Sequence, residues 1–233
     1  MSFYEENGPD IAAVPTAAQR EACYQYLAER AVRPDFVMVQ IGHSGLSVAD
    51  QQAPWRGERR YFGAVAWLQD ENVNIQPPNP NVQFLSLNLG GEPKGDEEQA
   101  EQEAAESWYS GPYDFSVPLS DGIAHEVFFG DVIGDSRVTD STKRTPLLLA
   151  EASRLLSPGG HVVIRETISP GRALKSLTTE VLAKAGLKSM LRLHWGDPLW
   201  SQLEESYDGQ TTSWFPKKEN FYQLLTKTAG EQE

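Results

Sequence analysis

The sequence is poor in cysteine. Its 233 residues include one cysteine, Cys23, which excludes an internal disulfide framework and a cysteine-rich metal site. No pair of histidines or cysteines has metal-ligand spacing, so we predict no bound metal. Cys23 falls in a predicted helix, where a buried apolar role is favoured over a reactive one.

Positive charge is also scarce. The chain carries 33 acidic and 20 basic residues, which gives a formal net charge of −13. Phosphate backbones and anionic lipids repel such a chain, so we expect neither a nucleic-acid nor a membrane partner. No apolar run is long enough to span a membrane. The first residues, MSFYEENGPD, lack the basic and apolar regions of a signal peptide. We therefore expect a cytoplasmic protein.

The length predicts one domain with a substantial core. We predict a polar N-terminal arm over residues 1–15 and a single domain over residues 16–233. An acidic insertion at about 90–112 interrupts that domain with seven acids, one lysine and no apolar stripe. This composition is typical of a solvated surface segment. An acidic docking segment, or a lid that ends at Trp108 and Tyr109, is the alternative interpretation.

The stretch Pro118–Thr167 has the clearest pattern. The apolar run Glu126–Phe129 precedes a Gly-Asp pair, which predicts a buried strand that ends in a polar loop. Helical spacing of leucine and alanine predicts a helix over Pro146–Leu156. The Ser-Pro-Gly-Gly segment at 157–160 ends that helix, and His161–Ile164 is the next strand.

Further elements are predicted on both sides of this stretch. Helical patterns run from a Thr16 cap to Ala31 and over Gly171–Ala185, and residues 196–216 read as a long polar loop. A strand that feeds a glycine-containing loop is typical of the nucleotide edge of Rossmann-like folds. We predict further strands at Phe36–Ile41, Tyr61–Leu68, Val82–Leu89, Leu187–Trp195 and Phe221–Thr226, of which Val82–Leu89 alternates apolar and polar residues.

PLSDGIAHEVFF resembles the segment that leads into the fourth strand of class I S-adenosylmethionine (SAM) methyltransferases. LLLAEASRLLSPGGHVVIRET is similar to their following helix, Pro-Gly-Gly turn and fifth strand. The resemblance implies an α/β fold: a Rossmann-like, seven-stranded, mostly parallel sheet with helices on both faces. It also implies SAM as cofactor, bound at the carboxyl ends of the first four strands.

The cofactor motifs of that family match this chain unevenly. The first-strand motif is an acid followed by three glycines at alternate positions, and here the acid position holds Gln40 while the last glycine position holds Leu46. The acid that holds the ribose falls on Val65, and the acid near the adenine falls on Asn88. The losses of the two acids at the ribose and the adenine would each remove about 1–3 kcal/mol of hydrogen bonding. The resemblance implies these cofactor-binding residues: Gln40, Gly42, His43, Ser44, Gly45, Asn88, Phe129 and Gly130.

Methyl transfer is an in-line displacement, for which the protein holds donor and acceptor together and dry. Asp131 is the predicted base or acceptor-orienting group, because it follows the fourth strand. His194 is the second predicted catalytic residue, with Trp195 and Trp200 on the acceptor side. Three further side chains are predicted within reach of the same rim: His125, Asp135 and Glu166.

Three functions are compatible with these residues. The first is a SAM-dependent methyltransferase for a small-molecule or peptide acceptor. The second is a catalytically inactive methyltransferase-like scaffold or regulatory partner, in a homo- or hetero-oligomer, which the losses at Leu46 and Val65 favour. The third is a non-methylating enzyme on the same fold, such as a cyclase or isomerase.

Overall fold

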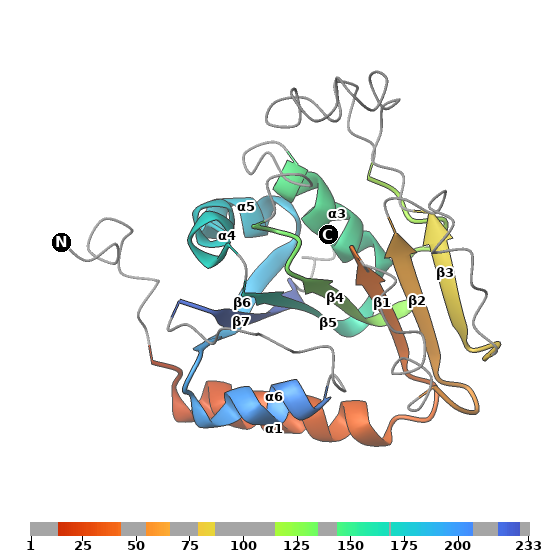
Figure 1. The fold of residues 1–233 in the computed structure, drawn as a ribbon, viewed down its shortest axis with the longest axis horizontal. Helices are drawn as coiled ribbons and strands as arrows, with labels where there is room; N and C mark the ends of the chain where they lie inside the picture. Colours follow the sequence, from red (N-terminus) through yellow and green to blue (C-terminus); the bar gives the residue numbers. More distant parts are fainter. Residues whose placement is uncertain are drawn as a thin grey trace, which may run out of the picture.

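The computed structural model describes residues 14–42, 55–65, 79–86, 115–134, 144–167, 169–206 and 219–228. One seven-stranded sheet forms its centre, in the order β3-β2-β1-β4-β5-β7-β6 (Figure 1). The neighbours among β1 to β5 pair in parallel, and β7 is antiparallel to both β5 and β6. The predicted sheet is confirmed. Its strands are β1 (Val37–Ile41), β2 (Arg60–Val65), β3 (Val82–Ser86), β4 (Ala124–Gly130), β5 (Leu156–Glu166), β6 (Leu187–His194) and β7 (Phe221–Lys227).

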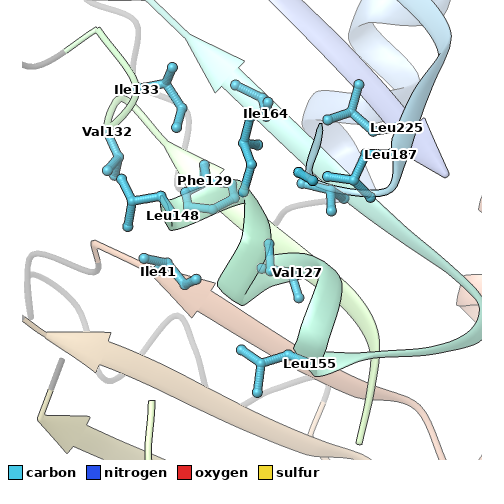
Figure 2. Close-up of a cluster of buried hydrophobic side chains, with 14 of the residues drawn as sticks. Ile41, Val127, Phe129, Val132, Ile133, Leu148, Leu155, Ile164, Leu187 and Leu225 are labelled. Carbon is cyan, nitrogen blue, oxygen red and sulfur yellow. The ribbon is translucent and has the colours of Figure 1, made fainter. Parts of the chain in front are cut away.

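Helices cover both faces of the sheet (Figure 1). Those on one face are α1 (Ala17–Val32) and α6 (Pro198–Ser206), and those on the other are α3 (Arg144–Leu155), α4 (Pro170–Ser176) and α5 (Thr179–Lys184). Successive strand residues point to opposite faces, so Val127 and Phe129 pack on the α3 side and Phe128 packs on the α1 side. Figure 2 shows Val127 and Phe129 among the buried side chains of α3 and β5.

Helix α1 begins where the sequence predicted. The Thr16 hydroxyl accepts a hydrogen bond from the Gln19 main-chain N–H, and the Gln19 side chain accepts one from the Thr16 N–H. This capping box satisfies two N–H groups that would otherwise lack helical partners. Cys23 lies on the inner side of α1, where burial raises the pKa of its thiol to about 11. The predicted apolar role of Cys23 is confirmed.

The β4–α3–β5 unit forms as predicted, with one difference at its turn. Helix α3 ends at Leu155, and β5 already begins at Leu156, which pairs with Ala124. The next pair in the register joins Glu126 to His161, so residues 157–160 bulge out of the strand. Gly159 in this bulge has φ +77°, a value that glycine adopts without steric cost. The proline-glycine segment is therefore a bulge within a longer strand.

The single helix predicted over residues 171–185 is wrong. The structure has two short helices, α4 and α5, separated at Leu177 and Thr178. Thr178 has an extended backbone, and its hydroxyl accepts a hydrogen bond from the Val181 N–H at 3.3 Å. Threonine is a strong N-cap residue, so it starts a new helix here. Gly186, with φ +68°, ends α5 as predicted.

The long loop predicted over residues 196–216 is wrong for its first half, where α6 forms. The apolar residues of α6 are Leu199, Trp200 and Leu203, and all three are buried. The Trp200 ring packs edge-on against Tyr222 of β7, with 4.6 Å between the ring centroids. Burial of this short apolar stripe stabilises the helix. The stripe is not apparent in the sequence because most residues around it are polar.

Two predicted segments lie largely outside the described residues: the N-terminal arm, except for residues 14 and 15, and the whole acidic insertion at 90–112. The division into an arm and one domain therefore stays a prediction. No helix in the described ranges has the length and apolar character needed to cross a membrane.

The structure predicts that acid weakens the fold through its histidines. The Nδ1 atom of His125 accepts a hydrogen bond from the Val37 N–H at 2.9 Å, which requires that nitrogen to be unprotonated. Burial, assisted by the charge of Arg33, lowers the pKa of His125, and burial lowers the pKa of His161. The unfolded chain therefore takes up these protons at higher pH than the folded protein. The contribution of these histidines to the free energy of unfolding is fully present above the ordinary histidine pKa of 6.5. It is lost as the pH falls from 6.5 through the lower pKa values of the folded protein.

We expect the free energy of unfolding to decrease between about pH 7.5 and pH 5.5, with about 0.5 kcal/mol of that decrease due to the partly exposed His125. Urea titrations of the wild type and His125→Asn measure this effect, because asparagine keeps an acceptor without titrating. An equally steep pH dependence in the two proteins would contradict the assignment to His125.

Candidate functional site

The candidate site lies at the carboxyl edge of the sheet between β1 and β4. The chain extends from β1 through β2 to β3 on one side, and β4 begins the other half of the sheet on the other side. The strand order therefore reverses between β1 and β4. Open α/β sheets bind ligands in the crevice that such a reversal leaves at the carboxyl ends of the strands.

Gln40 is the first predicted cofactor residue, and it lies inside the sheet. Its side-chain oxygen accepts a hydrogen bond from the Tyr61 hydroxyl at 2.7 Å, and only 7% of its surface is exposed. Burial raises the pKa of Tyr61 well above its usual value, so the phenol stays a donor. The carbonyl group of Gln40 thus already has a partner on the neighbouring strand.

Gly42 follows β1 and turns the chain out of the sheet. Its φ is +82°, and its N–H donates to the Ala64 carbonyl of β2 at 3.0 Å. A Cβ atom at this position would lie 2.2 Å from Cγ2 of Val132, which belongs to the turn after β4. Both the backbone and the packing therefore require glycine here. The turns after β1 and β4 touch each other at this point.

Phe129 and Gly130 end β4 with different surroundings. The Phe129 ring is fully buried in the core on the α3 side (Figure 2), so its side chain faces away from the edge. A Cβ atom on Gly130 would lie 3.0 Å from the Phe128 ring and 3.5 Å from Nη2 of Arg165. Gly130 has no side chain at this edge, and the predicted cofactor contacts of both residues stay predictions.

Asp131 is the only non-glycine residue with positive φ, +59°, in the described part of the chain. One carboxylate oxygen accepts from the Thr167 N–H at 2.6 Å and from its hydroxyl at 2.8 Å, and the other accepts from Arg165 at 2.7 Å. The Asp131 N–H donates to the Arg165 carbonyl at 2.9 Å. This aspartate therefore joins the turn after β4 to the end of β5.

Glu166 at the end of β5 connects back to the turn after β4. Its carboxylate is fully buried and accepts from the Gly134 N–H at 2.9 Å and from the Ser169 N–H at 3.0 Å. A Cβ atom on Gly134 would lie 2.5 Å from the Ser169 carbonyl oxygen. Glu166, which was predicted at the rim, is a buried residue that holds the turns after β4 and β5 together.

The structure does not bring His194 close to Asp131. His194 ends β6, and β5 and β7 lie between β6 and β4. Three strand spacings amount to about 14 Å. His194 lies beside Phe221, with 6.4 Å between ring centroids, and Trp195 next to it is 42% exposed. These two residues share the carboxyl edge of the sheet but not the β1–β4 crevice.

Two predicted rim residues lie elsewhere. His125 is near the start of β4, five residues before Gly130, so roughly 17 Å of strand separate it from the carboxyl edge. Trp200 is buried in the core on α6 rather than on an acceptor side. The structure thus makes His125 a hydrogen-bonded strand residue and Trp200 a core residue.

Several predicted residues cannot be compared with the structure. Val65 ends β2, but its side chain is not among the described ones. The residues that lie outside the described ranges are His43, Ser44, Gly45, Leu46, Asn88 and Asp135.

The described residues contain no group of three or more histidine, cysteine, aspartate or glutamate side chains that could hold a metal ion.

Arg165 and Thr167 are the site residues that sequence reasoning missed. Both follow the apolar core of β5 in the segment Ile-Arg-Glu-Thr, where three consecutive polar residues after a buried run are the available signal. That signal does not reveal their partner, because the pairing of Gly130 with Arg165 depends on the register between β4 and β5.

Comparisons with known proteins agree with this architecture. Neither a protein-family model nor a curated protein sequence matches the chain. Among solved structures, it is similar to a TehB-like SAM-dependent methyltransferase from Corynebacterium glutamicum, with 14% identity, a TM-score of 0.50, and coverage of 91% of this chain and 99% of that one. A chain from a complex between the Haloferax volcanii Trm112 methyltransferase activator and a putative methyltransferase has 12% identity, a TM-score of 0.48 and 91% coverage of both chains. The chain thus has the class I methyltransferase fold.

Proposed function

We propose that the protein binds SAM in the β1–β4 crevice and transfers its methyl group to a small-molecule or peptide acceptor. The observation that carries the proposal is the turn at Gly42, which lies at the point where the strand order reverses. This turn needs glycine on two independent grounds, its positive φ and the contact with Val132. The strand order and this turn both support a SAM site at this edge.

The main chain at this edge fits an adenosyl ligand better than the side chains do. Gly42 and Gly130 present backbone without side chains where the two strands end. The Gln40 carbonyl and the Asp131 carboxylate are bound by Tyr61, Arg165 and Thr167. We therefore assign the ligand contacts of the described residues to the backbone after β1 and β4. When bound, SAM would supply a methyl group on a positively charged sulfur.

The described residues also favour a dry, fixed site. Val132 and Ile133 follow Asp131 and are buried, with their side chains directed into the core (Figure 2). Exclusion of water and a fixed geometry are the main requirements of an in-line displacement. We assign the reacting atom of the acceptor to the carboxyl edge directly beside this crevice, because methyl transfer requires contact with the donor. His194 and the exposed Trp195 ring, farther along the same edge, would contact only a part of the acceptor remote from the methyl group.

A catalytically inactive scaffold is the second candidate. It is favoured by the partners of Gln40 and Asp131, because both side chains with predicted ligand roles already bind protein groups. A protein of this kind would use the same fold to bind a protein partner or a second copy of itself.

Calorimetric titration with SAM and S-adenosylhomocysteine (SAH) separates the two candidates. For a methyltransferase we expect SAH to bind with a Kd on the order of 10 µM. Adenosine alone and ATP are the control ligands, because they share the base and ribose but lack the amino-acid end. If neither SAM nor SAH gives heat or a thermal shift at millimolar concentration, the methyltransferase proposal fails, and the oligomeric state becomes the next measurement.

A further inference from the structure

The turns after β4 and β5 are joined by two acids in a reciprocal manner. Asp131 of the β4 turn binds Thr167 and Arg165 of β5 and its turn. Glu166 of β5 binds Gly134 of the β4 turn and Ser169 beyond β5. The two connections leave opposite faces of the sheet, because neighbouring residues of β5 point to opposite sides. Asp131, which belongs to the turn after β4, therefore fixes the turn after β5, and Glu166 of β5 fixes the turn after β4.

We propose that Asp131 is a positioning residue and not the proton acceptor of this site. With Glu166, it holds the turn after β4, which borders the β1–β4 crevice, in a single shape against the turn after β5. The part of this inference that concerns the ligand rests on the proposed SAM function. The joining of the two turns does not depend on that function.

The bonding of the Asp131 carboxylate carries the inference. Both of its oxygens accept hydrogen bonds from protein donors, with Thr167 on one and Arg165 on the other. The Arg165 guanidinium is itself held, 6.0 Å from the centroid of the Phe128 ring, and the ion pair is largely buried, at 11% and 14% side-chain exposure. A general base must reach the proton that it removes. This carboxylate would first have to leave three charge-assisted bonds.

The hydrogen bonds of the Asp131 carboxylate hold its backbone in an uncommon conformation. Its φ of +59° is uncommon for a residue with a side chain, and aspartate is one of the few residues that tolerate it. This conformation directs the next residue, Val132, onto Gly42 at the end of β1. The bonds of Asp131 thus set the contact between the turns after β1 and β4, at the place where the ligand is proposed to bind.

Three variants separate the backbone from the carboxylate. Asp131→Gly keeps the positive φ and removes the carboxylate, whereas Asp131→Asn keeps one oxygen acceptor for Thr167 and removes the charge. Thr167→Val removes only the hydroxyl donor. Asp35→Asn is the matched control, because Asp35 pairs with Arg33 in an exposed ion pair distant from this edge. For each protein we would measure amide hydrogen exchange at Thr167 and Gly134, together with the SAH affinity well below the melting temperature.

We expect Asp131→Gly to speed exchange of the Thr167 amide at least about tenfold and to weaken SAH binding roughly tenfold. Asp131→Asn should recover most of the affinity, and Thr167→Val should add little to Asp131→Gly, because the two residues form one unit. A proton acceptor is not needed to bind SAH. An SAH affinity that Asp131→Gly leaves unchanged, in a wild type that binds SAH, would therefore overturn the positioning role.

Unchanged amide exchange in Asp131→Gly would overturn the inference whether or not a ligand binds. The failure of the proposed function has a different signature. In that case the wild type would bind no SAH, which removes the role of Asp131 towards a ligand, while faster exchange at Thr167 and Gly134 would still establish that Asp131 joins the turns.

Discussion

Replacement of Gly42 by alanine is expected to lower the free energy of unfolding by about 3–5 kcal/mol. Two causes add. The φ of +82° costs a residue with a Cβ atom about 1–2 kcal/mol, and the new methyl group would lie 2.2 Å from Cγ2 of Val132. Because the strand ends are packed on both sides, relief of this overlap must displace the turn after β4. Urea unfolding monitored by circular dichroism measures the loss.

Gly57→Ala is the matched control for Gly42→Ala. Gly57 also has a positive φ, +62°, but nothing lies within 4 Å of its Cβ position. This variant reports the backbone cost alone, about 1 kcal/mol. The double variant Gly42→Ala/Val132→Ala should recover part of the loss, because it shortens the side chain that overlaps. Equal losses for Gly42→Ala and Gly57→Ala would contradict the contact between the two turns.

Replacement of Arg30 by methionine is expected to cost about 3–5 kcal/mol, because it leaves a buried carboxylate without its cation. Glu126 of β4 is fully buried, and Nε of Arg30 lies 2.8 Å from its Oε2 atom. The Tyr26 hydroxyl donates to the same oxygen. Arg30 also donates to the Ser206 carbonyl at the end of α6, so it connects both helices of this face to the sheet. Urea unfolding at neutral pH measures the cost.

Arg33→Met serves as the control on the same end of α1. Arg33 pairs with Asp35 at 2.9 Å, but both side chains are about half exposed, at 45% and 52%. An exposed pair of this kind contributes about 0–1 kcal/mol. The double variant Arg30→Met/Glu126→Gln should be more stable than Arg30→Met alone, because no buried charge is left unpaired. A double variant no more stable than Arg30→Met would show that packing, and not charge, causes the loss.

The fold was predictable where one local pattern decided the element. β1, β4 and β7 contain short apolar runs, and the Thr16 cap and the Gly186 stop are local signals. The failures have a common cause. Thr178 starts a second helix inside an apolar pattern, and α6 depends on a surface for Leu199 and Trp200 that only the folded sheet provides.

The positions of Gly42 and Asp131 in the sheet were predictable, but the bonding of the polar side chains near them was not. The strand-then-turn patterns correctly put Gly42 and Asp131 at neighbouring strand ends. They did not indicate that Gln40 binds Tyr61 or that Asp131 binds Thr167, because these contacts join strands through their register. The same polar side chains therefore suggested ligand contacts in the sequence and proved to be partners of other protein groups in the structure.

Hydrogen exchange of the whole protein with and without SAH tests the central claim most directly, namely that an adenosyl ligand binds between β1 and β4. We expect slower exchange in peptides that cover residues 36–42 and 124–134, and no change in peptides of α1 and α6. Unchanged exchange throughout at millimolar SAH, or protection confined to the α1 and α6 face, would contradict the claim.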